Sequence, residues 1–385
     1  MKGKINSSII AAMVFMIVIF AGGILFVCMP DREFSPLENR LLEQSPEFTT
    51  QKYFDGRYAA KLDTYLNDQF PFRDSFVKIK SSVDVTAGKL ESNGVFRCAD
   101  NYLMEDITVP SDSTVAAYKR TLKAFTEKYP DLMMTFLLAP NAANILSEKL
   151  PDAVRTADQN KYMDDLFAAV ESYGITPIDV RTDLIRAKEA KQIYYKTDHH
   201  WTTDGAYVAY RKFREIKKYN KDISYKPIVV KNDFCGTLYS KSGFTNGEYD
   251  TITIYLPDND ENYRDSIIYY ADSKVKTTSF YEKDNLKEKD AYTVFGGSNH
   301  PKYTIETPVV SQQNLLLLKD SYANSMIPFL SQHFRKIVVI DPRYFFDDID
   351  DIITSEKISQ VMFLYNANTF FSDDSLAMLL SSTAE

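Results

Sequence analysis

Short, mainly apolar runs alternate with amphipathic stretches along the chain after about residue 115. The apolar runs are LMMTFLLAP (132–140), ITPIDV (175–180), NLLLLK (314–319), KIVVIDP (336–342) and QVMFLYN (360–366). Stretches with helical periodicity, such as 118–130 and 163–174, lie between the runs and end at a proline or a glycine. Strands that alternate with helices at this spacing are typical of a parallel sheet. We therefore predict an α/β fold, a three-layer sandwich with a parallel sheet, over residues 116–385.

Two parts of the chain do not follow this alternation. Residues 30–115 are rich in turn and polar residues and have helical patterns on either side of Pro71, which suggests a linker and helical capping region. Residues from about 219 to 310 contain tyrosine-rich segments marked by glycine, such as GTLYSKSGFTNGEYDTITIYLPDND (236–260). This pattern is typical of antiparallel strands and hairpins, so we expect a β-rich insertion in the main domain.

The N-terminus differs in kind from the rest of the chain. An uncharged apolar run extends from Ile9 to Met29, with Lys2 and Lys4 before it and Asp31 and Glu33 after it. Such a run is about long enough to span a bilayer, and the lysines place residues 1–8 in the cytoplasm. A cleaved signal peptide is the alternative, but its apolar region is usually shorter. We expect an uncleaved single-pass anchor at 9–29, with the rest of the chain outside the cytoplasm.

Composition excludes some functions. The formal net charge is -8 and the isoelectric point is near 5.3, which argues against a nucleic-acid partner because phosphate backbones are bound by basic surfaces. Three cysteines are too few for a disulfide framework in a chain of 385 residues. Beyond the apolar run only Cys98 and Cys235 remain, and they are either a pair or two buried apolar residues.

The stretch KTDHHWTTDGAYVAY (196–210) contains the only tryptophan and two of the four histidines of the chain. Far along the sequence, the apolar run 314–319 leads directly into Asp320 and Ser321, where a parallel strand would end. Ligands bind in α/β proteins at the carboxyl ends of the strands. A serine nucleophile needs a base within hydrogen-bond reach and a third group that orients the base, and one histidine with Asp198 can supply both.

Simpler interpretations of the same residues exist. Ser321 after a strand could cap a helix, as serine often does. Asp198, His199 and His200, with His300, could instead bind a metal. However, adjacent histidines point in different directions in most backbones, and no spaced metal-ligand motif is present. We therefore favour a serine, a histidine base and an aspartate, and predict no metal.

Several motifs together resemble a known family. They are ENR (38–40), FPFRD (70–74), LAPNAANILSEKLP (138–151), DHHW (198–201) and KDS (319–321). The chain resembles the DHHW family and the alginate O-acetylation proteins, which have an SGNH hydrolase-like domain. The order of its blocks resembles a circular permutation of that domain, in which the serine block comes late in the chain and the Asp/His block early.

The resemblance implies specific catalytic residues. It assigns the nucleophile to Ser321, the base to His200 and the orienting carboxylate to Asp198, with His199 at the variable position of the Asp/His block. Lys319 stands where these hydrolases usually have glycine.

The resemblance also implies residues around the reacting group. Asn366, or Asn368, is expected to be the side-chain donor to the oxyanion beside the backbone N–H of Ser321. Where the family has its glycine block, this chain has Arg343 and Tyr344 instead, and because they follow a strand end they are expected to contact substrate. Trp201 is expected to pack beneath the histidine or to line the site.

The function implied by the resemblance is an extracytoplasmic O-acyltransferase that moves acetyl groups to hydroxyls of an exported or cell-surface polysaccharide. The expected partners are the polysaccharide acceptor and a multipass membrane acyltransferase that supplies the acyl group, and no cofactor is expected. A carbohydrate esterase with the same three residues is one alternative. A non-catalytic polysaccharide-binding or assembly protein is the other.

Overall fold

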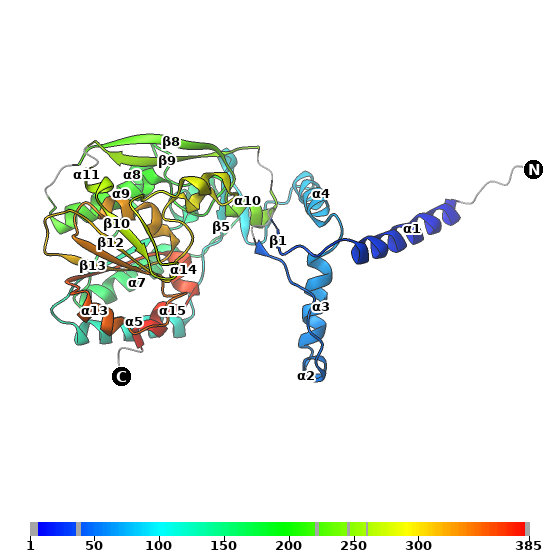
Figure 1. Cartoon of the computed structure of the whole chain (residues 1–385). Coiled ribbons are helices and arrows are strands. Elements are labelled where there is room, and N and C mark those ends of the chain that lie inside the picture. Colours follow the sequence, from blue (N-terminus) through cyan, green and yellow to red (C-terminus); the bar gives the residue numbers. More distant parts are fainter. Residues whose placement is uncertain (1–6, 36–39, 220–222, 245–246, 259–260, 382–385) are drawn as a thin grey trace, which may run out of the picture. The chain divides into compact units, whose positions relative to one another are not determined.

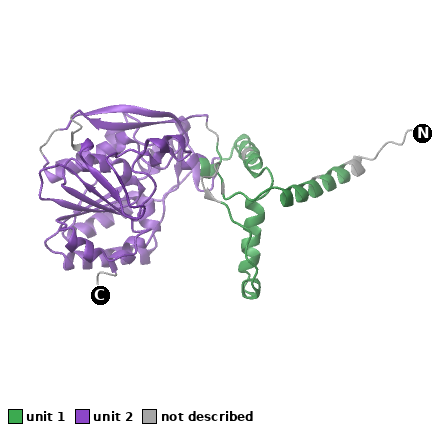
Figure 2. Ribbon diagram, in the orientation of Figure 1, with its two compact units in different colours: residues 1–89, 240–245 green, residues 90–239, 246–385 purple. Residues whose placement is uncertain are grey.

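The computed structural model describes residues 7–35, 40–219, 223–244, 247–258 and 261–381. The chain divides into two compact units, one of residues 1–89 and 240–245 and the other of residues 90–239 and 246–385 (Figure 2). This division precedes the boundary predicted near residue 115, because the three-stranded sheet of β3 (Glu91–Ser92), β4 (Val95–Arg97) and β5 (Leu103–Glu105) belongs to the larger unit.

The smaller unit is mainly helical. Its helices are α1 (Ser7–Cys28), α2 (Thr50–Phe54), α3 (Arg57–Asp68) and α4 (Arg73–Thr86). Among the described residues, the segment Ala11–Cys28 of α1 is long and apolar enough to cross a membrane, a test that a signal sequence would also pass. The end of α1 packs on α3, where the ring of Phe26 contacts that of Tyr65 and the Tyr65 hydroxyl donates to Asp31.

The larger unit is built on an eight-stranded mixed sheet with the order β11-β10-β12-β14-β13-β15-β6-β7 (Figure 1). The parallel strands are β6 (Met133–Ala139), β7 (Thr176–Pro177), β13 (Asn314–Lys319), β14 (Lys336–Ile340) and β15 (Gln360–Asn366). The antiparallel strands at one edge are β10 (Ile267–Tyr270), β11 (Val275–Thr277) and β12 (Lys302–Glu306). The α/β fold class predicted from the apolar runs is confirmed.

Helices cover both faces of this sheet. One face packs against α5 (Asp112–Lys128), α7 (Gln159–Ser172), α13 (Ile349–Ser355) and α15 (Ser375–Ser381). The other packs against α8 (Arg181–Ala187) and α9 (Thr203–Lys217), above which lies a hairpin of β8 (Tyr225–Phe234) and β9 (Asp250–Pro257) (Figure 1). The apolar runs are therefore buried on both sides, as parallel strands require.

Two predicted elements differ in detail. The run 175–180 pairs over only two residues, because it lies at the sheet edge and its Pro177 has no N–H to donate. Between the runs 314–319 and 336–342, where the alternation predicts a helix, the chain forms a 3₁₀ turn, η5 (Ser321–Ser325), followed by the short α12 (Ile327–Leu330). The tyrosine-rich region 219–310 supplies both the β8–β9 hairpin and the antiparallel edge of the main sheet.

Candidate active site

The turn after β13 places Ser321 at the centre of the parallel sheet. If β13 is counted first, the strands β13, β14, β15, β6 and β7 lie in the spatial order 2-1-3-4-5, which has its switch point between β13 and β15. Asp320 fixes the turn there. One of its carboxylate oxygens accepts from the N–H of Tyr322 at 2.9 Å and the other from the N–H of Asn366 at 2.8 Å.

A tight loop before α9 brings the Asp198–Trp201 segment to the same place. Tyr194 and Trp201 form an isolated β-bridge at the ends of the loop. Inside the loop, the buried carboxylate of Asp250 accepts from the N–H groups of Lys196 and Thr197 at 2.9 and 2.7 Å and from the Thr197 hydroxyl at 2.6 Å. Asp250 therefore acts as an anchor that holds the backbone just before Asp198.

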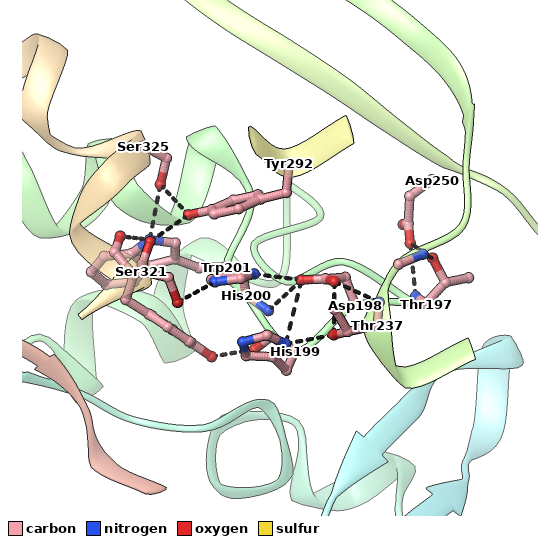
Figure 3. A network of polar contacts seen from close by, with 12 residues as sticks. Thr197, Asp198, His199, His200, Trp201, Thr237, Asp250, Tyr292, Ser321 and Ser325 are labelled. Carbon is pink, nitrogen blue, oxygen red and sulfur yellow. Dashed lines mark hydrogen bonds and ion pairs between the residues drawn. The ribbon is translucent and has the colours of Figure 1, made fainter. Parts of the chain in front are cut away.

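Three side chains form a continuous hydrogen-bonded chain (Figure 3). The Nε2 atom of His200 lies 2.8 Å from the Oγ of Ser321, and its Nδ1 lies 2.6 Å from Oδ1 of Asp198. Because an ionised carboxylate only accepts, Nδ1 carries the proton and Nε2 is free to accept from the serine hydroxyl. This is the arrangement in which a histidine can take the proton of a serine nucleophile.

The surroundings keep Asp198 ionised. Burial by itself raises the pKa of the Asp198 carboxyl, but His200, His199 and the N–H of Thr237 outweigh that effect and hold the pKa well below its ordinary value. The Oδ2 atom accepts from Thr237 twice, from its N–H at 2.8 Å and from its hydroxyl at 3.0 Å. Both oxygens of this buried carboxylate are thus satisfied.

His200 remains neutral over a wide pH range. Burial lowers the pKa of the imidazole to about 4, and the neighbouring His199 adds to the lowering, while Asp198 acts in the opposite sense. A base works only when unprotonated, so activity should persist as the pH falls through the ordinary histidine value of about 6.5. We expect the acid limb of the rate of p-nitrophenyl acetate cleavage to lie near pH 4. An acid limb near 6.5 would contradict this environment for His200.

Aromatic rings hold the imidazole in place. The ring of Tyr292, from the 3₁₀ turn η4 (Ala291–Val294), stacks on that of His200 with centroids 3.7 Å apart, and its hydroxyl donates to the Ser321 carbonyl at 3.1 Å. Trp201 is fully buried, and its Nε1 donates to the Tyr322 carbonyl at 3.0 Å and to the Ser325 Oγ at 3.1 Å. Trp201 therefore packs under the serine turn and fastens it to the histidine loop.

Gly236 is required by the close approach of the backbone to Asp198. A Cβ atom at residue 236 would lie 2.2 Å from the Cβ of Asp198 and 2.4 Å from its Oδ2. We expect Gly236→Ala to displace the carboxylate and lower the rate of p-nitrophenyl acetate cleavage by about 100-fold, the scale of a misplacement near 1 Å. Cys235→Ala is the matched control, since Cys235 is the preceding residue and is unpaired. Equal activity of both variants would show that the rate does not depend on the exact position of the Asp198 carboxylate.

Asn366 is engaged in a buried network. Its Oδ1 accepts from the N–H of Asn368 at 3.0 Å and from the Asn141 side chain at 3.2 Å, and its Nδ2 donates to the Ala139 carbonyl at 3.3 Å. It is also the N-cap of α14 (Ala367–Ser372). These bonds join the ends of β15 and β6. They direct the Asn366 amide nitrogen to a backbone carbonyl and its oxygen to N–H donors. Its oxyanion role stays a prediction.

Arg343 and Tyr344 follow β14, as predicted, but their two side chains have different surroundings. The Arg343 guanidinium makes two hydrogen bonds to the buried Asp341 carboxylate, at 2.8 and 2.6 Å, and Lys319 pairs with the same group at 3.5 Å. The lysine that replaces the usual glycine is thus buried in the core. It shares the Asp341 carboxylate with Arg343 and precedes Asp320 in the sequence. Tyr344 is 45% exposed. Substrate contacts for Arg343 and Tyr344 stay predictions.

The alternative metal interpretation can be compared with the geometry. Ligand atoms of Asp198, His199 and His200 lie within 4.8 Å of one another. Both ring nitrogens of His200 and both oxygens of Asp198 already have hydrogen-bond partners, so a metal would have to break the chain that leads to Ser321. His300, the fourth residue of that alternative, pairs instead with Asp272, at 2.8 Å.

The larger unit has an SGNH hydrolase-like α/β fold. The family model described as SGNH hydrolase-like domain, acetyltransferase AlgX, matches residues 102–222. The chain is similar to the probable alginate O-acetylase AlgJ of Pseudomonas fluorescens, with 22% identity over 162 residues, which are 40% of this chain and 41% of that protein. The match thus spans less than half the length of that curated relative.

Solved structures support the same fold. A DHHW family protein from Eubacterium siraeum matches with a TM-score of 0.61 and 23% identity, over 76% of this chain and 96% of that one. Bacillus cereus PatB1, in a structure with a sulfonyl adduct, matches with a TM-score of 0.58 and 20% identity, over 73% of this chain and 98% of that one. The resemblance predicted from the DHHW motif and the block order is confirmed.

Sequence reasoning missed the residues that hold this site together. Thr237, Asp250, Tyr292 and Ser325 come from the tyrosine-rich region and from η5, and none belongs to a recognisable motif. Tyr292 is one of 26 tyrosines, so the sequence alone does not distinguish it. The one usable signal was Gly236, a glycine beside a cysteine at the end of a strand, which marks a close backbone approach.

Proposed function

We propose that this protein is an extracytoplasmic O-acetyltransferase that transfers acetyl groups to hydroxyls of an exported or cell-surface polysaccharide. The observation that carries the proposal is the contact of 2.8 Å between His200 Nε2 and Ser321 Oγ, with Asp198 on the other side of the imidazole at 2.6 Å. Similarity to proteins described as acetyltransferases supports acetyl as the transferred group.

The first half of the reaction forms an acyl-enzyme. Ser321 Oγ attacks the carbonyl carbon of an acetyl ester while its proton passes to His200 Nε2. The imidazolium is stabilised by Asp198 and by the stacked face of Tyr292. The backbone N–H of Ser321 is the expected donor to the oxyanion. His200 then returns the proton to the leaving alkoxide, which leaves an acetyl ester on Ser321.

The second half transfers the group. A sugar hydroxyl gives its proton to His200 and attacks the acetyl-serine, and Ser321 leaves with the proton returned by His200. If water attacks instead, the same residues make an esterase. In the transferase role, α1 anchors the chain in the cell membrane with the main domain outside, and a multipass membrane acyltransferase supplies the acetyl group.

The experiment that tests this proposal compares acceptors. The full chain in detergent is given p-nitrophenyl acetate with and without neutral and anionic oligosaccharides, and acetylated sugar and free acetate are both measured. A transferase yields acetylated sugar at the expense of acetate. Acetate alone, at every oligosaccharide concentration, would identify an esterase. No turnover and no acyl-enzyme would favour a binding or assembly protein.

A further inference from the structure

His199 lies against the catalytic ring and has no part in the reaction described above. Its imidazole lies against that of His200, with centroids 3.9 Å apart and the rings tilted by 36° (Figure 3). We propose that Nε2 of His199 binds a second hydroxyl of the acceptor, next to the reacting one, so that the site selects vicinal diols of sugars. The inference rests on the proposed transferase function.

Hydrogen bonds fix which nitrogen of His199 carries the proton. Its Nδ1 lies 2.6 Å from the hydroxyl oxygen of Thr237, and that hydroxyl lies 3.0 Å from Oδ2 of Asp198. The carboxylate can only accept, so the single Thr237 proton goes to Asp198. Thr237 must then accept from Nδ1–H of His199, which leaves Nε2 of the neutral ring as an acceptor. Asp198 thus orients His200 directly and His199 through Thr237.

The two acceptor nitrogens point the same way. Nδ1 of His199 lies 3.8 Å from Oδ1 of Asp198, and Nδ1 of His200 lies 2.6 Å from the same atom. Because both adjacent rings turn Nδ1 toward Asp198, both Nε2 atoms point away from it, toward the Ser321 end (Figure 3). The backbone of His199 is held as well, since its carbonyl accepts from the Tyr322 hydroxyl.

Exposure separates the two rings. The His199 side chain is 27% exposed, whereas that of His200 is 6% exposed. His199 is therefore accessible to a molecule that approaches Ser321, and its hydrogen bond to Thr237 uses Nδ1 rather than Nε2.

A vicinal diol matches this pair of acceptors. Adjacent hydroxyls of a sugar are close enough together to face two adjacent rings at once. The reacting hydroxyl donates its proton to His200 Nε2 and attacks the acetyl-serine, while its neighbour keeps its proton and donates a hydrogen bond to His199 Nε2. Water and simple alcohols lack the second hydroxyl, so they gain less from the site. His199 would thereby favour sugar over water as acceptor.

The test measures how the acetyl-enzyme partitions. Full-length protein in detergent is acetylated with p-nitrophenyl acetate, and transfer to cis-1,2-cyclohexanediol is compared with transfer to cyclohexanol. We expect wild type to prefer the diol by about 10-fold, the scale of one hydrogen bond. His199→Phe, which keeps an aromatic ring, should reduce the ratio of diol to cyclohexanol transfer, measured per acetyl-enzyme formed, to about that expected from having two hydroxyls. His199→Gln, which keeps a polar side chain, is the second variant.

The outcomes separate this inference from the function it rests on. If the nitrophenol burst disappears in Ser321→Ala but the diol preference is unchanged in both His199 variants, the role of His199 is overturned. The transferase mechanism then still stands. A wild type without diol preference overturns it as well. If wild type forms no acyl-enzyme, the transferase and the diol site both fall. Retained labelling of Ser321 by a sulfonyl fluoride shows that each His199 variant is folded.

Discussion

Ser321→Ala is expected to abolish acyl-enzyme formation and to reduce p-nitrophenyl acetate turnover by a factor on the order of 10⁴ or more, as the loss of a serine nucleophile does elsewhere. The reason is chemical, because alanine at the end of β13 leaves His200 without a proton to accept or an oxygen to activate. The change should not unfold the protein, since the turn is held by Asp320, Trp201 and Tyr292. Stopped-flow release of nitrophenol measures both burst and turnover.

The matched control is Ser331→Ala. Ser331 is buried, whereas Ser321 is half-buried, and it lies ten residues further along. Its hydroxyl donates to the Pro328 carbonyl and takes no part in the chain of Asp198 and His200. Its removal should change turnover by less than about 10-fold. A Ser321→Ala variant that keeps the wild-type burst would mean that another group is the nucleophile.

Asp198→Asn is expected to have the second largest effect, a loss on the order of 10³ to 10⁴ in turnover. Asp198 accepts four hydrogen bonds, two from the backbone and side chain of His200 and two from Thr237. An asparagine must turn an NH₂ group toward one of these pairs of donors. If it faces His200, the imidazole adopts the tautomer with the proton on Nε2, which cannot accept from Ser321.

Asp204→Asn provides the control for the aspartate. Asp204 lies in the first turn of α9 and pairs with Lys191 and the Tyr255 hydroxyl, away from both histidines. Its substitution should leave turnover within about 10-fold of wild type. Because Asp198 is buried, circular dichroism must show that the Asn variant is folded. A folded Asp198→Asn enzyme with wild-type turnover would contradict the orienting role of the carboxylate.

The strands were predictable because their residues obey a local rule. A run such as QVMFLYN (360–366) can only be buried on both faces, and β15 occupies those residues in the structure. Permuted block order was also predictable, since the strands expected to deliver the serine, glycine and asparagine blocks follow one another along the chain as β13, β14 and β15. They are neighbours in the sheet, in the order β14-β13-β15.

The surroundings of the site residues were not predictable, because they depend on contacts between residues far apart in the sequence. Nothing near Tyr292 indicates that its ring covers His200, because the two residues are far apart along the chain and meet only after the tyrosine-rich region folds over the sheet. For Asn366, a motif placed the residue at the right strand end but could not reveal that its amide is used as a helix cap. Side-chain direction at a strand end is decided by tertiary hydrogen bonds, which periodicity does not contain.

Acetylation of Ser321 during turnover can be detected on the peptide that contains it. The full-length protein is quenched in acid milliseconds after mixing with p-nitrophenyl acetate, digested, and sequenced by tandem mass spectrometry. We expect one acetyl group on the Ser321 hydroxyl, which disappears when an acceptor sugar is added before the quench. An acetyl group found only on other residues, or an unmodified Ser321 peptide during steady turnover, would contradict this expectation.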